Sequence, residues 1–321
     1  MLLPAADHLT VTVNGSYLDA APWMRLALDY LDAQAAAARP SAAAPTASTL
    51  APMPIPTTGP DTTPSLVEAS LHFDTVDFGD NQLTRQMQAV SRLVHGQPVS
   101  ATFQIANPTG RSLQAELDSP APGALKLGVT IGDAATWVRI FTGPWHTRAP
   151  APGQFGTVVS QLIKVPSMVA GGDVTATADV RFADPEWLQG HLRLTHGTMI
   201  RPPFLLRALA LKTGRQLQAS PLIEELVIDH LALGPSYVDV SGFSLKGSGF
   251  INNLKVKTGH HDYVSDKLSV EGTYFGVGFE VSGTLAKPFV GLSDKNVLIR
   301  ALGQKNENEF FNPEEEPAKP K

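Results

Sequence analysis

Residues 99–106 read VSATFQIA, with apolar side chains at every odd-numbered position and mostly polar side chains between them. Successive side chains of a β-strand point to opposite faces, so this alternation predicts a strand with one apolar face. The same period of two recurs from Val67 to Phe73 and from Phe275 to Val281. Short turn sequences such as Asn107-Pro108-Thr109-Gly110 separate such runs. The pattern predicts an all-β fold, mainly antiparallel, in which strands adjacent in sequence pair.

Composition divides the chain into segments. Residues 1–38 are expected to form a strand and a helix, and residues 39–65, rich in Pro, Ala and Thr, a linker or long surface loop. The main β domain is expected over residues 66–304, and residues 305–321 as a charged, disordered tail. Short helices are expected within the main domain near residues 134–141, 157–163 and 203–211.

The residue totals exclude several classes of protein. The chain has 321 residues, of which 43% are hydrophobic, enough to bury a sizeable core. It has no cysteine, which excludes disulfides, thiolate metal sites and a cysteine nucleophile. The net charge is −5 and the basic residues are scattered, so no basic stripe for nucleic acid is present. No run approaches the roughly 20 apolar residues that span a bilayer.

Motifs for catalysis and metal binding are weak. The sequence contains no G-x-S-x-G, H-E-x-x-H or P-loop motif. His260-His261-Asp262 is the most metal-like cluster, but neighbouring residues on a strand face opposite ways, and a solvated loop is favoured there. Asp229-His230 interrupts an apolar run and indicates a bulge or bend. We expect no enzymatic activity, metal or cofactor. A carbohydrate-active β enzyme would need a convergent carboxylate pair, which the sequence neither shows nor excludes.

Several segments resemble, in family order, the C-terminal region of AsmA-like proteins. Residues 9–22, LTVTVNGSYLDAAP, are similar to the segment that opens this region. Four later segments resemble further motifs of the family. They are Gly132-Asp133-Ala134-Ala135 with Trp137 and Arg139, Gly171-Gly172-Asp173-Val174, residues 190–211, and FEVSGTLAKP at residues 279–288. The resemblance extends over residues 9–292. The family's helix before the last strand has no counterpart between Asn253 and Tyr274.

The resemblance implies a fold, a place and a function. The fold would be a strongly curved β-sheet groove (β-taco-like), apolar inside and polar outside, with a few short helices. The protein would lie in the bacterial periplasm, tethered to the inner membrane through an upstream anchor that this sequence lacks. It would carry phospholipid between the inner and outer membranes and support outer-membrane integrity. Its expected partners are phospholipid acyl chains and other envelope proteins, not nucleic acid.

The candidate lipid-contacting residues are the apolar members of the alternating runs. They are Leu71, Phe73, Val99, Ala101, Phe103, Ile105, Leu127, Val129, Val174, Ala176, Leu192, Leu194, Val238, Val240, Phe275, Val277 and Phe279. Periodicity alone favours a closed core in which the apolar face meets a second layer, and it is the resemblance that favours the groove. The alternative is therefore a β-sandwich or solenoid scaffold that binds another envelope protein and carries no lipid.

Overall fold

The computed structural model describes residues 8–22, 65–79, 83–95, 97–121, 123–142, 168–181, 184, 186–234, 236–285 and 287–293. The linker expected over residues 39–65 lies outside this part of the chain except for its last residue. The helix expected near residues 157–163 and the tail from residue 305 also lie outside it. Of the helix expected after the first strand, only its start at residues 21–22 is described.

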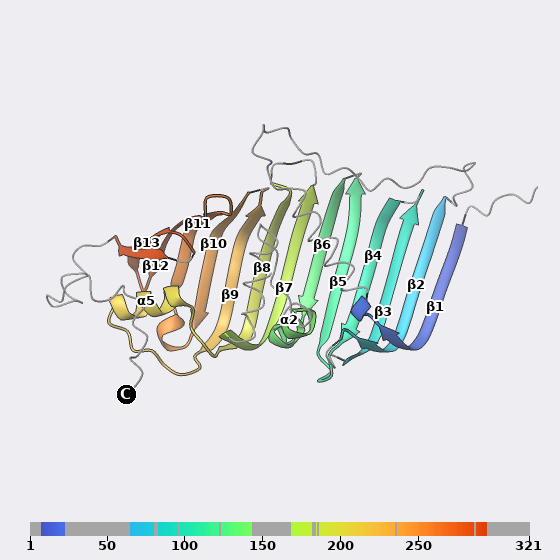
Figure 1. Cartoon of the computed structure of the whole chain (residues 1–321), viewed down its shortest axis with the longest axis horizontal. Coiled ribbons are helices and arrows are strands. Elements are labelled where there is room, and N and C mark those ends of the chain that lie inside the picture. The colour runs from blue at the N-terminus through green and yellow to red at the C-terminus, as the bar shows by residue number, and fades with distance from the viewer. Residues whose placement is uncertain are drawn as a thin grey trace, which may run out of the picture.

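The described strands form one sheet of fourteen strands whose spatial order is the order of the sequence (Figure 1). They are β1 (His8–Asp19), β2 (Leu66–Asp77), β3 (Leu83–Val94), β4 (Gln97–Ala106), β5 (Ser112–Ala121), β6 (Ala124–Ile131), β7 (Val169–Arg181), β8 (Leu188–Met199), β9 (Leu222–Leu233), β10 (Tyr237–Gly247), β11 (Leu254–Asp262), β12 (Lys267–Tyr274), β13 (Val277–Gly283) and β14 (Pro288–Leu292). β1 and β2 are parallel, and every other neighbouring pair is antiparallel. The expected all-β, mainly antiparallel fold is confirmed.

The register places apolar residues of successive strands directly opposite one another. One row runs from Ala101 through Leu117, Leu127, Ala178, Gly190 and Leu231 to Val240, so that it crosses β4 to β10. A second row joins Ala115, Val129, Ala176, Leu192 and Ile228. Paired residues share a face, so the alternation of each strand adds up to one apolar face.

A β-bulge keeps this face continuous where the strands bend. Gly190 pairs with Leu231 but Leu192 pairs with Ile228, so β9 has one residue more than β8 over this interval. The additional residue keeps Ile228 and Leu231 on the same face although they are three residues apart. The bulge or bend expected at Asp229-His230 is confirmed. Opposite it, Gly242 of β10 has φ +64°, a conformation that favours glycine.

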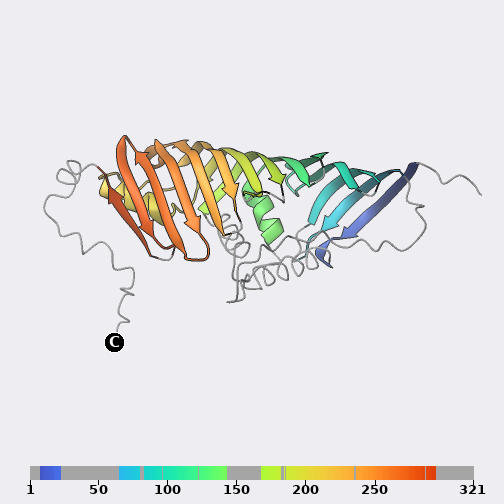
Figure 2. The same ribbon diagram turned by 90° about the horizontal axis from the view of Figure 1, so that it is seen from above.

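Two helices pack on the apolar face. Helix α2 (Ala134–Thr142) contacts β7, and α5 (Phe204–Lys212) contacts β14. Figure 2 shows α2 on one side of the sheet. Asp133 precedes α2, and its Oδ1 accepts a hydrogen bond from the Thr136 amide at 3.4 Å, as expected of an N-cap. The helices expected near residues 134–141 and 203–211 are confirmed.

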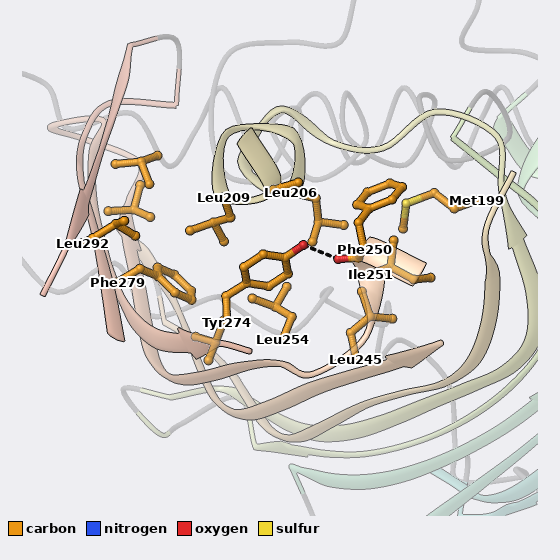
Figure 3. Packing of buried hydrophobic residues seen from close by; sticks show 14 of the residues in the cluster. Met199, Leu206, Leu209, Leu245, Phe250, Ile251, Leu254, Tyr274, Phe279 and Leu292 are labelled. Atoms are coloured by element: carbon orange, nitrogen blue, oxygen red, sulfur yellow. Dashed lines mark hydrogen bonds between the residues drawn. The ribbon is translucent and has the colours of Figure 1, made fainter. Parts of the chain in front are cut away.

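Each helix closes a packed cluster. The N-terminal cluster joins Trp137 and Ile140 of α2 to strand residues that include Phe73, Val76, Ile105 and Leu113. The C-terminal cluster joins Leu206 and Leu209 of α5 to residues of β8–β14 and of the 3₁₀ turn η2 (Gly249–Ile251). In Figure 3, the C-terminal strands bend around α5 and this cluster. The tightly packed core therefore lies in two separate places along the sheet.

Candidate functional site

Beside the two clusters, strands β4 to β10 carry a set of apolar residues that neither cluster includes, which we call the central strip. It consists of Ala101, Leu117, Leu127, Val129, Val174, Ala176, Ala178, Leu192, Ile228, Leu231 and Val240. Each of these side chains is partly exposed, whereas the largest members of both clusters are fully buried. Apolar side chains left open to water in a contiguous row typically mark a binding surface.

The other face of the same strands is polar. On β7 the residues that alternate with the central strip are Thr175, Thr177 and Asp179, all exposed. Farther along, Glu225 accepts contacts of 2.8 Å from both Lys246 Nζ and an Arg193 guanidinium nitrogen. The hydrogen bond from Lys246, helped by the charge of Arg193, lowers the pKa of the Glu225 carboxyl. The sheet is thus amphipathic, with a polar face exposed to water and an apolar face on the other side.

The candidate residues expected from the sequence fall into distinct groups. Phe73 (9% exposed), Ile105 and Phe279 (both 0%) are buried within the clusters and therefore belong to packed cores rather than to an open surface. Seven others lie in the central strip, namely Ala101, Leu127, Val129, Val174, Ala176, Leu192 and Val240. The remaining strand residues are partly exposed. Leu71 and Phe103 pack beside the N-terminal cluster, Leu194 and Val277 beside the C-terminal cluster, and Val99 and Val238 beside neither.

The strand position expected for Phe275 is wrong. Tyr274 pairs with Val277, and Phe275 and Gly276 between them have φ +49° and +80°. Positive φ at both central residues is typical of a two-residue type I′ hairpin turn. The Phe275 ring instead packs beside the C-terminal cluster, with the Arg215 guanidinium 4.1 Å from its centroid.

Four residues of the central strip, Leu117, Ala178, Ile228 and Leu231, are not among the candidates expected from the sequence. Leu117 and Ala178 continue alternating runs, and only the pairing of strands places them in the same row as Leu127. Ile228 and Leu231 are three residues apart, which breaks a period of two. The bulge-forming pair Asp229-His230 between them is the signal that could have identified both as residues of one face.

The sequence predicted a loop at His260-His261, and this is wrong. The two residues lie within β11, where His260 pairs with Asp239 and His261 with Val238 of β10. The two side chains do face opposite ways. His260 is exposed, with Nδ1 2.6 Å from an Asp239 oxygen, whereas His261 is 7% exposed, with Nε2 3.0 Å from Asp266. Within the described part of the chain, no three His, Asp or Glu residues are grouped closely enough to hold a metal ion.

Comparison of the chain with protein-family models, curated proteins and solved structures found no match. Among the helices that the structure describes, none combines the length and the apolar character needed to cross a bilayer.

Proposed function

We propose that this protein is a non-enzymatic lipid-handling module of the bacterial cell envelope, and that phospholipid acyl chains lie along the central strip. The observation that carries the proposal is the combination of a continuous apolar row across β4 to β10 with partial exposure of every side chain in it. A closed core of that extent would bury these side chains as completely as Trp137 or Phe279 is buried.

The chemistry of the strip suits an acyl chain. A hydrocarbon tail makes no hydrogen bonds, so it needs only apolar contact, and burying it is worth about 0.8 kcal/mol per CH₂. Small residues, among them Ala101, Ala176 and Ala178, leave space beside the larger Leu and Val side chains. Because neighbouring residues of the strip are nearly equivalent, a tail would bind with similar affinity at many positions. Such binding suits transfer along the sheet rather than fixation at one place.

The resemblance to AsmA-like proteins supports the finer features of the proposal. On this model the sheet curves into a groove around the lipid, and the protein acts in the periplasm, tethered to the inner membrane, in phospholipid transport that maintains the outer membrane. The bulge at Asp229-His230 and the bend of the C-terminal strands around α5 are in keeping with such curvature.

Lipid analysis of neighbouring variants tests the proposal. Ala176 and Thr177 are adjacent on β7 and have opposite faces, with Ala176 in the central strip and Thr177 exposed. Native mass spectrometry and lipid extraction should find phospholipid with the wild-type chain and with Thr177→Asp, but several-fold less with Ala176→Asp. Circular dichroism checks that both variants fold. A wild-type chain purified without lipid, or equal lipid content in the two variants, contradicts the proposal.

A second candidate function, a scaffold for another envelope protein, is favoured by the edge of the sheet at β1. Leu9, Val11 and Val13 are 47%, 40% and 42% exposed, and β1 pairs with a described strand only on its β2 side. Unpaired edges accept an added strand. A chain that folds and binds a protein partner through β1, but has no lipid, would support the scaffold instead.

A further inference from the structure

A polar cavity of about 440 Å³ lies where the start of α2 meets the ends of β7 and β8. Its lining includes the charged residues Arg111, Arg139, Asp133 and Asp173, together with His196 and the exposed side chain of Ile200. Two arginines and two carboxylates thus converge on one cavity from the β4–β5 turn, the residue before α2, α2 itself and β7. The next residue of β7, Val174, belongs to the central strip, and its side chain lies on the opposite face of the sheet from that of Asp173.

The two arginine side chains of this cavity carry the positive charge that a ligand would meet. Among the described residues, neither the Arg111 nor the Arg139 guanidinium forms an ion pair or a hydrogen bond. A guanidinium presents a planar fork of donors that matches a phosphate group. Both arginines are exposed, so the cavity is accessible to a charged group from solvent.

The carboxylates of the cavity make only long contacts. Asp173 Oδ1 accepts from the Asp133 amide and Asp173 Oδ2 lies near His196 Nδ1, both at 3.4 Å. Asp133 Oδ1 accepts from the Thr136 amide, also at 3.4 Å. Such distances are beyond those of strong hydrogen bonds, so these oxygens are available to a better donor. The start of α2 is capped by Asp133 itself, and the side chains rather than the helix end form the site.

We propose that this cavity binds the zwitterionic headgroup of a phospholipid, with its phosphate at Arg111 and Arg139 and its primary ammonium at Asp133 and Asp173. This inference rests on the proposed function, because the phospholipid whose acyl chains lie along the central strip would supply the headgroup. A headgroup with a phosphate and an ammonium a few atoms apart would pair its negative charge with the two arginines and its positive charge with the two carboxylates. An anionic glycerol headgroup would leave the carboxylates without a cation, and a choline group has no N–H to donate to them.

Soluble headgroups test the cavity independently of the acyl chains. In NMR titrations of the whole chain, glycerophosphoethanolamine should bind saturably, and at least several-fold more tightly than inorganic phosphate, glycerophosphocholine or glycerophosphoglycerol. Arg111→Gln and Arg139→Gln should each weaken this binding about tenfold, because each removes a charge-assisted contact. The control is Arg181→Gln, at the opposite end of β7, where Arg181 is exposed and lies 3.9 Å from Asp184; it should leave the affinity unchanged.

Three results would overturn the inference. They are the absence of saturable binding, equal or tighter binding of inorganic phosphate, which would make free phosphate the ligand, and equal affinity in the arginine and control variants. If the chain still purifies with phospholipid while any of these holds, the proposed lipid function stands and only the headgroup site fails. A chain that purifies without lipid but binds glycerophosphoethanolamine through the arginines would instead contradict the proposed function and support the site.

Discussion

The hydroxyl group of Tyr274 donates a hydrogen bond to the backbone carbonyl oxygen of Phe250 (Figure 3). Tyr274 ends β12 and is 0% exposed, and Phe250 lies in the 3₁₀ turn η2 and is 2% exposed. The bond therefore joins an irregular turn to the sheet inside the C-terminal cluster. A buried carbonyl without a donor would cost free energy, so this single hydroxyl matters for the closed end of the sheet.

Removing that hydroxyl should destabilise the protein. We expect Tyr274→Phe to lower the free energy of unfolding by about 1 to 3 kcal/mol, since it leaves the Phe250 carbonyl unsatisfied in an apolar environment. Urea unfolding followed by circular dichroism measures the loss. The matched control is Tyr17→Phe, whose hydroxyl donates to Asp77 at 3.0 Å but whose side chain is 54% exposed. An equal effect of the two substitutions would contradict this explanation.

The same tyrosine should make stability depend on alkaline pH. Burial, partly opposed by the charge of Arg215, raises the pKa of Tyr274 to about 12 from its ordinary value of 10.0. The folded state thus favours the neutral phenol over the phenolate. This preference contributes fully to the free energy of unfolding below pH 10, and the contribution is lost as pH rises toward 12. The loss amounts to about 2 to 3 kcal/mol. The difference in unfolding free energy between wild type and Tyr274→Phe should shrink over this range; a constant difference would contradict it.

The N-terminal cluster should depend on the volume of Trp137 rather than on its indole N–H. Trp137 is 0% exposed, and its Nε1 has no hydrogen-bond partner among the described residues. Trp137→Ala should cost about 3 to 5 kcal/mol because it leaves a cavity. Trp137→Phe should cost less than half of that, since it keeps a ring and removes the unsatisfied donor. Thermal unfolding compares the two, and equal losses would contradict the prediction.

The bend opposite Asp229 should require glycine. Gly242 has φ +64°, and an added Cβ would lie 2.5 Å from an Asp229 carboxylate oxygen. We expect Gly242→Ala to destabilise the protein by about 1 to 3 kcal/mol. Gly128 on β6 is the control, because its φ is not positive and an added Cβ meets no atom within 4 Å. Gly128→Ala should leave the urea midpoint unchanged or raise it; a similar loss in both variants would contradict the role of the bend.

The sequence predicted the strands better than their arrangement. Alternation such as that of residues 99–106 depends only on which face meets water, so it identified β4 and its neighbours. The parallel pairing of β1 with β2 could not be predicted, because it depends on the path of the chain between them. β14, Pro288–Leu292, was missed because five residues beginning with proline show too little periodicity.

The candidate site was predictable in part for the same reason. Alternation identified residues such as Ala176 and Leu192 as members of an apolar face. It could not tell them from Ile105 and Phe279, because burial of the latter two depends on contacts that side chains distant in the sequence complete. The polar cavity beside α2 was also missed, since Arg111, Arg139 and Asp173 meet only through tertiary structure.

The most direct test of the central claim is photo-crosslinking of lipid at two adjacent residues of β8. Leu192 lies in the central strip and His191 on the polar face. A benzophenone amino acid placed at position 192, in protein produced in bacteria and irradiated, should crosslink to phospholipid detected by mass spectrometry. The same group at position 191 should give little or none. Equal crosslinking at both positions, or none at 192 in a folded chain, would contradict the claim that the apolar face of this sheet holds lipid.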